Sequence, residues 1–328
     1  MADSASQIFA APAVAVRGPL LGNLFCVLSM ALWAMGFPAI DTLVGRVPPL
    51  PMTALRMGLA VAFLLPIWAL VEGKRGVMSA RWWQGLWVGG LGFGLGGTLL
   101  FAAQSHIDPV TLVILTACSP IFGILLECLV DGRRLTVWLI LGLMLSVLGG
   151  VLAYLAQLDL FAMGAAVAAR GAGFFIGAAL VVASVMFFTW GSRATVRALP
   201  GMTGLGRTTV TLVGALIVTL GLSLAAGQLG TLAVALPQFS PADIGALLIY
   251  SLGALAVSQL LWILGVGHLG IGVASMHFNS VAFYVMVIMF VLGADWNWVQ
   301  AAGALLVGLG VLLAQRRRRG GGGAAVSV

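Results

Sequence analysis

Long apolar stretches alternate with short polar connections along the chain. A transmembrane helix needs about 20 largely apolar residues, and ten stretches meet that length: 19–40, 50–71, 82–104, 109–130, 135–155, 171–192, 205–226, 242–265, 269–292 and 297–315. Runs of this length predict helices, because the strands of a membrane barrel are about ten residues long and alternate in polarity. The pattern therefore predicts an all-α polytopic membrane protein with ten transmembrane helices.

Composition excludes a soluble protein with a single membrane anchor. Of the 328 residues, 61% are hydrophobic and only 8% are charged, against about 25% in soluble domains. The net charge of +7 is not arranged as a basic stripe between aromatic residues, so no nucleic-acid partner is expected. The spacing of Cys26, Cys118 and Cys128 fits neither zinc nor a disulfide framework. We expect no metal and no cofactor, and a lipid bilayer as the surroundings.

The distribution of lysine and arginine predicts the orientation of the helices. With the N-terminus inside, twelve of the 16 basic residues fall in cytoplasmic segments and two fall in outer loops. The other two, Arg56 and Arg207, lie in or at the start of the second and seventh helices. Ten spans with both termini in the cytoplasm follow. The first apolar run lacks a basic leader and is too long for a signal peptide, so it is kept as a helix.

Two parts of the sequence align without gaps at an offset of 161 residues. This offset pairs Phe101 with Trp262, Thr116 with His277, Ser119 with Ser280, Gly142 with Gly303, and Gly149 with Gly310. The alignment predicts two five-helix repeats, and because five is odd, the second repeat must be inverted relative to the first. The expected segments are a cytoplasmic N-terminus 1–18, a first repeat 19–155, an external linker 156–170, a second repeat 171–315, and a basic, glycine-rich tail 316–328.

Polar residues lie at the middle of the fourth and ninth helices. Thr116 and Ser119 lie in one, and His277, Asn279 and Ser280 in the other. Proline at 120 cannot donate to the carbonyl of Thr116, so a helix kink is expected at Pro120. Matching polar positions in inverted repeats are where a midplane substrate site is expected. For His277, three interpretations stay open: a neutral imidazole hydrogen-bonded to a neighbouring helix, a contact with substrate, or proton coupling.

Further candidates for a central cavity lie on other helices. Arg56 either extends its head to the lipid headgroups or provides a cation at the outer mouth of the cavity. Most tryptophans lie at helix ends, as an aromatic belt does, but three have polar or glycine neighbours inside helices, where they could stack a planar solute or pack against lipid. The amides of two glutamines could hold a zwitterion or bridge helices. The further candidates are therefore Trp33, Trp190, Trp262, Phe101, Gln104 and Gln259.

Three stretches resemble a known family. "ALWAMGFPAI", "PPLPMTALRMGLA" and "SPIFGILLECLVDGRRLTVWLILGLMLSVLGGVLA" resemble the repeat of the EamA-type drug/metabolite transporter superfamily, over about residues 20 to 315. Length, ten spans and tryptophan content look most like the bacterial YddG-type exporters of aromatic amino acids and methyl viologen, which implies a bacterial inner membrane. Arg133 and Ala294 stand where the family has a glutamate in its repeat ending, so no role of that glutamate can be transferred.

The leading hypothesis is a secondary transporter that exports small amphipathic solutes by alternating access around a midplane cavity. The resemblance implies aromatic amino acids, and aromatic cations as a further class. The same fold could instead carry other amino acids, a sugar phosphate or a nucleotide sugar. The two phosphate-bearing solutes would require paired cations at mid-depth. An intramembrane enzyme is the remaining alternative, although all nine acidic residues lie near helix ends or in loops. The expected partners are a small-molecule substrate and lipid, with the chain acting as a monomer or homodimer.

Overall fold

The structure is a computed structural model that describes residues 18–43, 45–107, 112, 115–155 and 172–316. Every regular element in this part of the chain is helical. The first half contains α2 (Pro19–Asp41), α3 (Pro49–Met78), α4 (Trp82–Gly89), η1 (Gly90–Leu95), α5 (Gly96–Gln104), α7 (Ser119–Val130) and α8 (Val137–Leu155). Residues 1–17, 156–171 and 317–328 lie outside the described residues, and with them almost all of the predicted N-terminal segment 1–18, linker 156–170 and tail 316–328.

The second half follows a similar order, with the additional short elements α12 and η2. It contains α10 (Ala172–Arg197), α11 (Gly204–Ala225), α12 (Gly230–Ala235), η2 (Leu236–Gln238), α13 (Pro241–Leu248), η3 (Ile249–Val257), α14 (Ser258–Leu269), α15 (Ile271–Ala274), η4 (Ser275–Ser280), α16 (Val281–Val291) and α17 (Trp298–Ala314). Gly270 separates α14 from α15 with a φ of 77°, a left-handed conformation that favours glycine.

Seven helical stretches among the described residues are long and apolar enough to cross a membrane. Three further apolar stretches are shorter: Ser119–Val130, Val137–Ala153 and Trp298–Ala314. The described part of the chain is therefore all-helical and has the helices of a multi-pass membrane protein. The count of ten membrane spans stays a prediction, because the fourth predicted span, 109–130, is continuously described only from residue 115 onward.

Four helices depart from α-helical geometry at positions that the 161-residue offset relates. The third predicted span contains the π-helical turn η1 and the eighth contains η3. In the fourth, the helix is interrupted at Ala117 and Cys118, and Pro120 lies in the first turn of α7, where its missing N–H costs little. In the ninth, the corresponding residues form the 3₁₀ segment η4. The kink expected at Pro120 is thus an interruption just before it.

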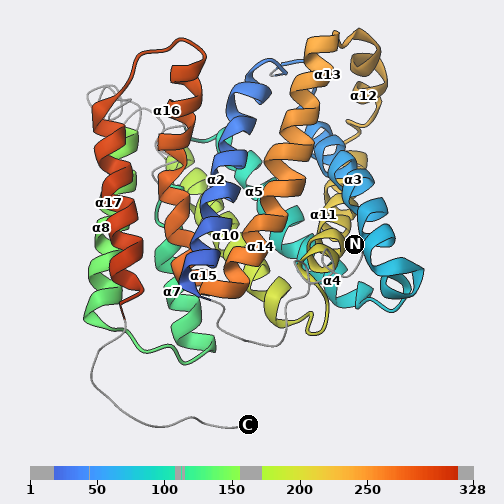
Figure 1. The fold of residues 1–328 in the computed structure, drawn as a ribbon. Helices are drawn as coiled ribbons and strands as arrows, with labels where there is room; N and C mark the ends of the chain where they lie inside the picture. The colour runs from blue at the N-terminus through green and yellow to red at the C-terminus, as the bar shows by residue number, and fades with distance from the viewer. Residues whose placement is uncertain (1–17, 44, 108–111, 113–114, 156–171, 317–328) are drawn as a thin grey trace.

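Helices from the two halves pack against each other in matching pairs (Figure 1). The first helix, α2, packs along η3 and α14, and its counterpart α10 packs along η1 and α5. At one edge α3 packs against α11, and at the other edge α8 packs against α17. Each pair joins one helix of the first half to one of the second, so the core lies between the halves.

Glycines determine how closely α8 and α17 approach. A Cβ at Gly149 would lie 2.5 Å from the carbonyl oxygen of Gly303, and one at Gly303 would lie 2.6 Å from that of Gly149. Gly142 and Gly310 meet in the same reciprocal way. Since positions rise along α8 as they fall along α17, the two helices run antiparallel. Adding 161 residues converts each of the two contacts into the other.

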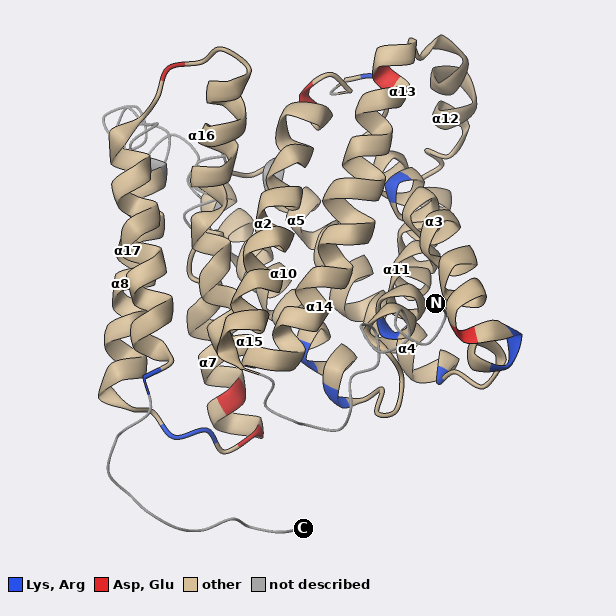
Figure 2. Ribbon diagram, viewed as in Figure 1, with Lys and Arg blue, Asp and Glu red and all other residues tan. Residues whose placement is uncertain are grey.

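Most of the lysine and arginine positions lie at one end of the bundle (Figure 2). The same end contains both limits of the described chain, because the amides of Asn23 in α2 and Gln315 after α17 exchange hydrogen bonds of 2.8 and 3.0 Å. Here Asp131, just after α7, accepts two hydrogen bonds from Arg193 at the end of α10, at 2.8 and 2.5 Å. This ion pair ties the fourth predicted helix to the sixth.

We expect Asp131→Asn to change stability in a pH-dependent way. The hydrogen bond from Arg193 lowers the pKa of Asp131 below its ordinary value, with the charges of Arg193 and Arg197 adding to the effect and slight burial opposing it. The stabilisation is therefore present above the unfolded pKa of about 3.9 and is lost as pH falls through the lower folded value. Asn should lower the free energy of unfolding at pH 7 by about 1 kcal/mol or less. It should also reduce the fall of the unfolding temperature as pH is lowered. Superimposable pH curves for the two proteins would contradict this.

Candidate functional site

A cavity of about 220 Å³ lies between the two halves, at the level of the helix irregularities. Its wall includes residues of α2, α3, η1, α5, α10, α11, η3, α14 and η4 and of the interruption before α7. The π-helical and 3₁₀ segments thus lie around one space. Irregular helix geometry of this kind is frequent at functional sites, and in membranes it is tolerated where it lines a cavity.

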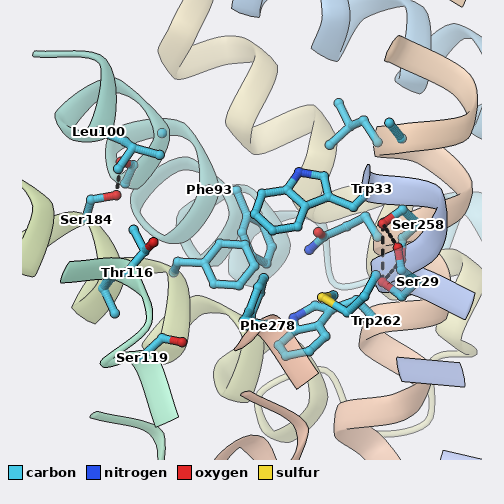
Figure 3. Close-up of a pocket in the computed structure, with 18 of the residues that line it drawn as sticks. Ser29, Trp33, Phe93, Leu100, Thr116, Ser119, Ser184, Ser258, Trp262 and Phe278 are labelled. Atoms are coloured by element: carbon cyan, nitrogen blue, oxygen red, sulfur yellow. Dashed lines mark hydrogen bonds between the residues drawn. The ribbon is translucent and has the colours of Figure 1, made fainter. Parts of the chain in front are cut away.

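Aromatic rings form much of the wall, with Phe278 at the centre of the group (Figure 3). Its ring centroid lies 4.6 Å from that of Trp262 and 5.5 Å from those of Trp33 and Phe188. The ring of Phe93 in η1 lies 5.5 Å from that of Phe188 in α10. These spacings are typical of favourable edge and tilted contacts. The rings come from five separate helical segments, so the tertiary fold assembles the wall.

Hydrogen bonds fix the polar part of the wall. Ser29 on α2 and Ser258 on α14 each donate to the other's backbone carbonyl, at 2.8 and 2.9 Å. Ser184 donates to the carbonyl of Gly96 at 2.7 Å, and the indole nitrogen of Trp262 donates to Ser192 Oγ at 3.0 Å. These bonds join helices of opposite halves or hold a ring in place, and they leave little freedom in the wall.

Three polar groups on the wall have atoms without a partner. Asn279 donates through Nδ2 to the carbonyl and the hydroxyl of Ser146, at 3.0 and 3.1 Å, so its Oδ1 is the atom left over. The hydroxyl of Ser119 and the Nε2 of Gln259 are likewise buried without a hydrogen-bond partner among the described residues. A buried polar group of this kind costs about 1–3 kcal/mol until it is satisfied. Within the described part of the chain, these three atoms are open to a water molecule or to a polar group of a bound molecule.

Arg56 is the cavity's charged residue among those described. Its guanidinium lies 3.8 Å from the centre of the Tyr250 ring and donates hydrogen bonds of 3.0 Å from Nε to Tyr250 O and from Nη2 to Ala254 O. Both carbonyls belong to the π-helical turn η3. The side chain therefore turns toward the second half of the protein and not toward headgroups along α3, which removes the snorkelling reading.

The structure brings together seven of the twelve residues that the sequence nominated for the cavity. The wall includes Trp33, Arg56, Thr116, Ser119, Gln259, Trp262 and Asn279. Four nominated residues, Phe101, Trp190, His277 and Ser280, are not part of it, and the side chain of Gln104 lies outside the described residues. That the seven bind a substrate stays a prediction.

The contacts of His277 are with its own segment of the chain. Its Nδ1 lies 3.2 Å from the carbonyl of Ala274, three residues earlier in its own helix, and the side chain is buried away from the cavity. Ser280 donates to the carbonyl of His277 at 2.6 Å. Both residues thus bond to local backbone groups at the 3₁₀ segment, and Phe278 and Asn279 between them are the ones on the cavity wall.

Several wall residues escaped the sequence analysis, and a second register would have found them. Ser29 and Ser184, Met30 and Val185, Trp33 and Phe188, and Met57 and Leu212 are each 155 positions apart. The 161-residue offset adds Phe93 with Ala254, Gly97 with Ser258, and Ala117 with Phe278. The two offsets differ by six residues because the connection after α11 is longer than its counterpart. Alignment of the first two helices with the sixth and seventh at 155 positions was the missing signal.

Nothing in the described part of the chain could hold a metal by clustered side chains, since no group of three or more His, Cys, Asp or Glu residues forms there. The described acidic residues lie near helix ends, away from the cavity wall. The site therefore offers aromatic surface, hydroxyls, amides and one guanidinium, which are groups for binding and orienting a solute.

Comparison with known proteins agrees with this picture. Residues 20–155 match the model of the EamA-like transporter family. A solved structure titled "Crystal structure of protein" has a TM-score of 0.70 at 19% identity and covers 91% of this chain and 98% of that chain, which shows a shared fold. No curated protein sequence matched. This match covers less than half of the chain, and it shows that the first predicted repeat is similar to the EamA-like transporter family.

Proposed function

We propose that this protein is a secondary transporter that exports small amphipathic organic solutes, aromatic amino acids above all, by alternating access around the central cavity. The observation that carries the proposal is an aromatic wall, assembled from both halves, that also holds buried polar atoms without partners. Rings can stack a planar solute, and the unpaired atoms can bind its polar groups. A carrier of this kind needs no cofactor.

Support for two inverted five-helix repeats comes from the packing. The exchange of the Gly142–Gly310 and Gly149–Gly303 contacts under the 161-residue offset is what a two-fold axis across antiparallel α8 and α17 would produce. The matched π-helical turns and the seven matched pairs around the cavity fit the same axis. Inverted repeats allow one bundle to rock against the other about a fixed site, which is the motion that alternating access requires.

The proposed orientation places both termini in the cytoplasm of a bacterial inner membrane. It rests on the lysine and arginine positions, most of which lie at one end of the bundle (Figure 2), and on the Asn23–Gln315 hydrogen bonds at that end. Cytoplasmic segments of inner-membrane proteins carry an excess of lysine and arginine. Outward flux of solute is part of the proposal, in line with the YddG-type exporters that the sequence resembles.

Phosphate esters fit the cavity less well than amino acids. A sugar phosphate or nucleotide sugar calls for two or more cations around a doubly charged group. Within the described part of the chain the wall includes Arg56 but not Arg207, whose Nε donates to the carbonyl of Leu199 at 3.0 Å. One guanidinium with neutral amides and hydroxyls suits a singly charged carboxylate.

Transport by purified protein tests the proposal. In proteoliposomes loaded with unlabelled amino acid, labelled tryptophan or phenylalanine should exchange across the membrane. Trp33→Ala should reduce this flux about tenfold, because it removes a stacking surface from the wall. Trp83→Ala is the matched control, since Trp83 lies on the outer surface with 69% of its area exposed, and it should stay within about twofold of the wild type. Absence of exchange for all aromatic and related amino acids would refute the proposed function.

A further inference from the structure

The charge of the cavity is one-sided. Arg56 is its charged residue, and none of the described acidic side chains lines the wall to balance it. The neighbouring carbonyls of Tyr250 and Ala254 contribute only partial negative charge. A cationic solute in this space would meet a guanidinium and no carboxylate, at a depth where poor solvation makes charge interactions stronger than in water.

Contacts with the second half orient the guanidinium. Stacking on Tyr250 covers one face, and the hydrogen bonds from Nε and Nη2 to the carbonyls of η3 hold one edge. The hydrogen bonds to the η3 carbonyls use Nε and one hydrogen of Nη2, so Nη1 takes no part in them. A guanidinium fork binds a carboxylate through two parallel N–H groups, and Nη1 with the second hydrogen of Nη2 form such a pair.

The pseudo-symmetry of the two halves fails at this position. Counterparts of Arg56 and Tyr250 in the two registers are Thr211 and Gly89. Those two residues are in such close contact that a Cβ at Gly89 would overlap the backbone of Thr211, so no side chain fits between them. The contact between α4 and α11 is thus closed by bare backbone, whereas the equivalent contact between α3 and η3 contains an arginine on an aromatic ring. The cavity is otherwise nearly symmetric, and Arg56 places a positive charge on one side of it.

We infer that Arg56 binds the carboxylate of the transported solute, so that the cavity selects aromatic carboxylates, as zwitterions or anions, and rejects aromatic cations. The inference rests on the proposed transport function and narrows its substrate class. The rings of Trp33, Phe188 and Phe278 then face the apolar body of the solute. The unpaired Oδ1 of Asn279 and hydroxyl of Ser119 are acceptors for an ammonium group, and they carry no formal charge.

A purely structural role of Arg56 makes a different prediction. If the arginine only braces α3 against η3, its loss weakens the binding of every solute equally. If it binds the carboxylate, its loss changes the ratio between solutes that have a carboxylate and those that do not. A ratio measured within one variant is insensitive to partial unfolding, since only folded protein contributes to it.

The experiment measures binding of three indoles to purified protein and, separately, flux. Tryptophan has both charged groups, indole-3-propionate lacks the ammonium, and tryptamine lacks the carboxylate. In the wild type, indole-3-propionate should bind within a few-fold of tryptophan, and tryptamine at least about tenfold more weakly, the size expected for a charge-assisted hydrogen bond. In Arg56→Gln the preference for tryptophan over tryptamine should fall to about twofold, and Arg56→Lys should restore part of it.

Arg46→Gln is the matched control. It also removes one arginine, but Arg46 lies outside the cavity in an ion pair of 3.2 Å with Asp243, and the preference should not change. Equal binding of tryptamine and tryptophan to the wild type, or an unchanged preference in Arg56→Gln, would overturn the inference even where flux is observed. Selective binding without any flux would instead refute transport and leave the carboxylate site standing.

Discussion

A single methyl group at position 149 is expected to destabilise the protein by at least about 2 kcal/mol. The Cβ of Gly149→Ala would lie 2.5 Å from Gly303 O and 2.9 Å from Val307 N. Both atoms are backbone, so no side-chain rotation can make room, and the helices α8 and α17 must separate. Overpacking a well-packed contact usually costs about 1–3 kcal/mol, and this pair also loses the close approach that small residues provide between membrane helices.

Gly308→Ala is the control for this substitution. Gly308 lies on the same helix pair, but nothing lies within 4 Å of a Cβ placed there. Alanine is the better helix former by about 1 kcal/mol, so this variant should be neutral or slightly more stable. Thermal unfolding in detergent measures both variants. Equal unfolding temperatures for Gly149→Ala and the wild type would show that α8 and α17 do not pack as described.

The sequence predicted the helices well and the cavity only in part. Helix positions follow from the length of apolar runs, which the bilayer thickness constrains, and most described ends lie within a few residues of the predicted spans. The fourth helix is an exception, because Pro120 ends up in the first turn of a new helix. The third and eighth contain π-helical turns, for which the apolar pattern gives no signal.

Which side chains face inward was harder to predict, for a physical reason. In a membrane both the lipid-facing and the protein-facing surfaces of a helix are apolar, so hydrophobic periodicity does not distinguish them. Phe93, Phe188 and Phe278 therefore looked like any other apolar residue, although they make up much of the wall. Polar residues were more informative, yet His277 and Ser280 bond to backbone carbonyls of their own helix.

Arg56 shows how sequence and structure combine. From the sequence, a guanidinium inside an apolar run is costly and requires an explanation, but a headgroup contact and a cavity were equally open. The carbonyls of η3 and the ring of Tyr250 decide between them, because they direct the side chain toward the second half. Those partners are 194 and 198 residues away along the chain, so only the fold could reveal them.

Removal of the Glu127 carboxylate is expected to have a second large effect, at the end of the bundle where the basic residues gather. Glu127, at the end of α7, is buried and accepts a hydrogen bond of 3.0 Å from the backbone nitrogen of Gly272 and one from Arg133. It thus joins the first half to the start of α15. Glu127→Ala leaves the Gly272 N–H without its acceptor, which costs about 1–3 kcal/mol, and leaves Arg133 unpaired, so we expect a loss of about 2 kcal/mol.

Two further variants separate these contributions. Glu127→Gln keeps an acceptor for Gly272 and loses only the ion pair, so it should cost about half as much. Arg133→Ala should cost less than about 1 kcal/mol, because the Arg133 side chain is 27% exposed and such pairs contribute little. An order in which Arg133→Ala is the most harmful would contradict the importance of the Gly272 contact.

The same substitution tests whether this contact controls access to the cavity. If the halves rock apart at this end during transport, the Glu127–Gly272 contact exists only while the end is closed. A loss of 2 kcal/mol from the closed state then raises the open population by more than about tenfold. Thr116→Cys, on the cavity wall, in a background without the native cysteines, should react correspondingly faster with a water-soluble thiol reagent added from that side. Lower stability with an unchanged labelling rate would mean that the contact persists in every state, and the gate must then be sought at the opposite end, where Arg46 pairs with Asp243.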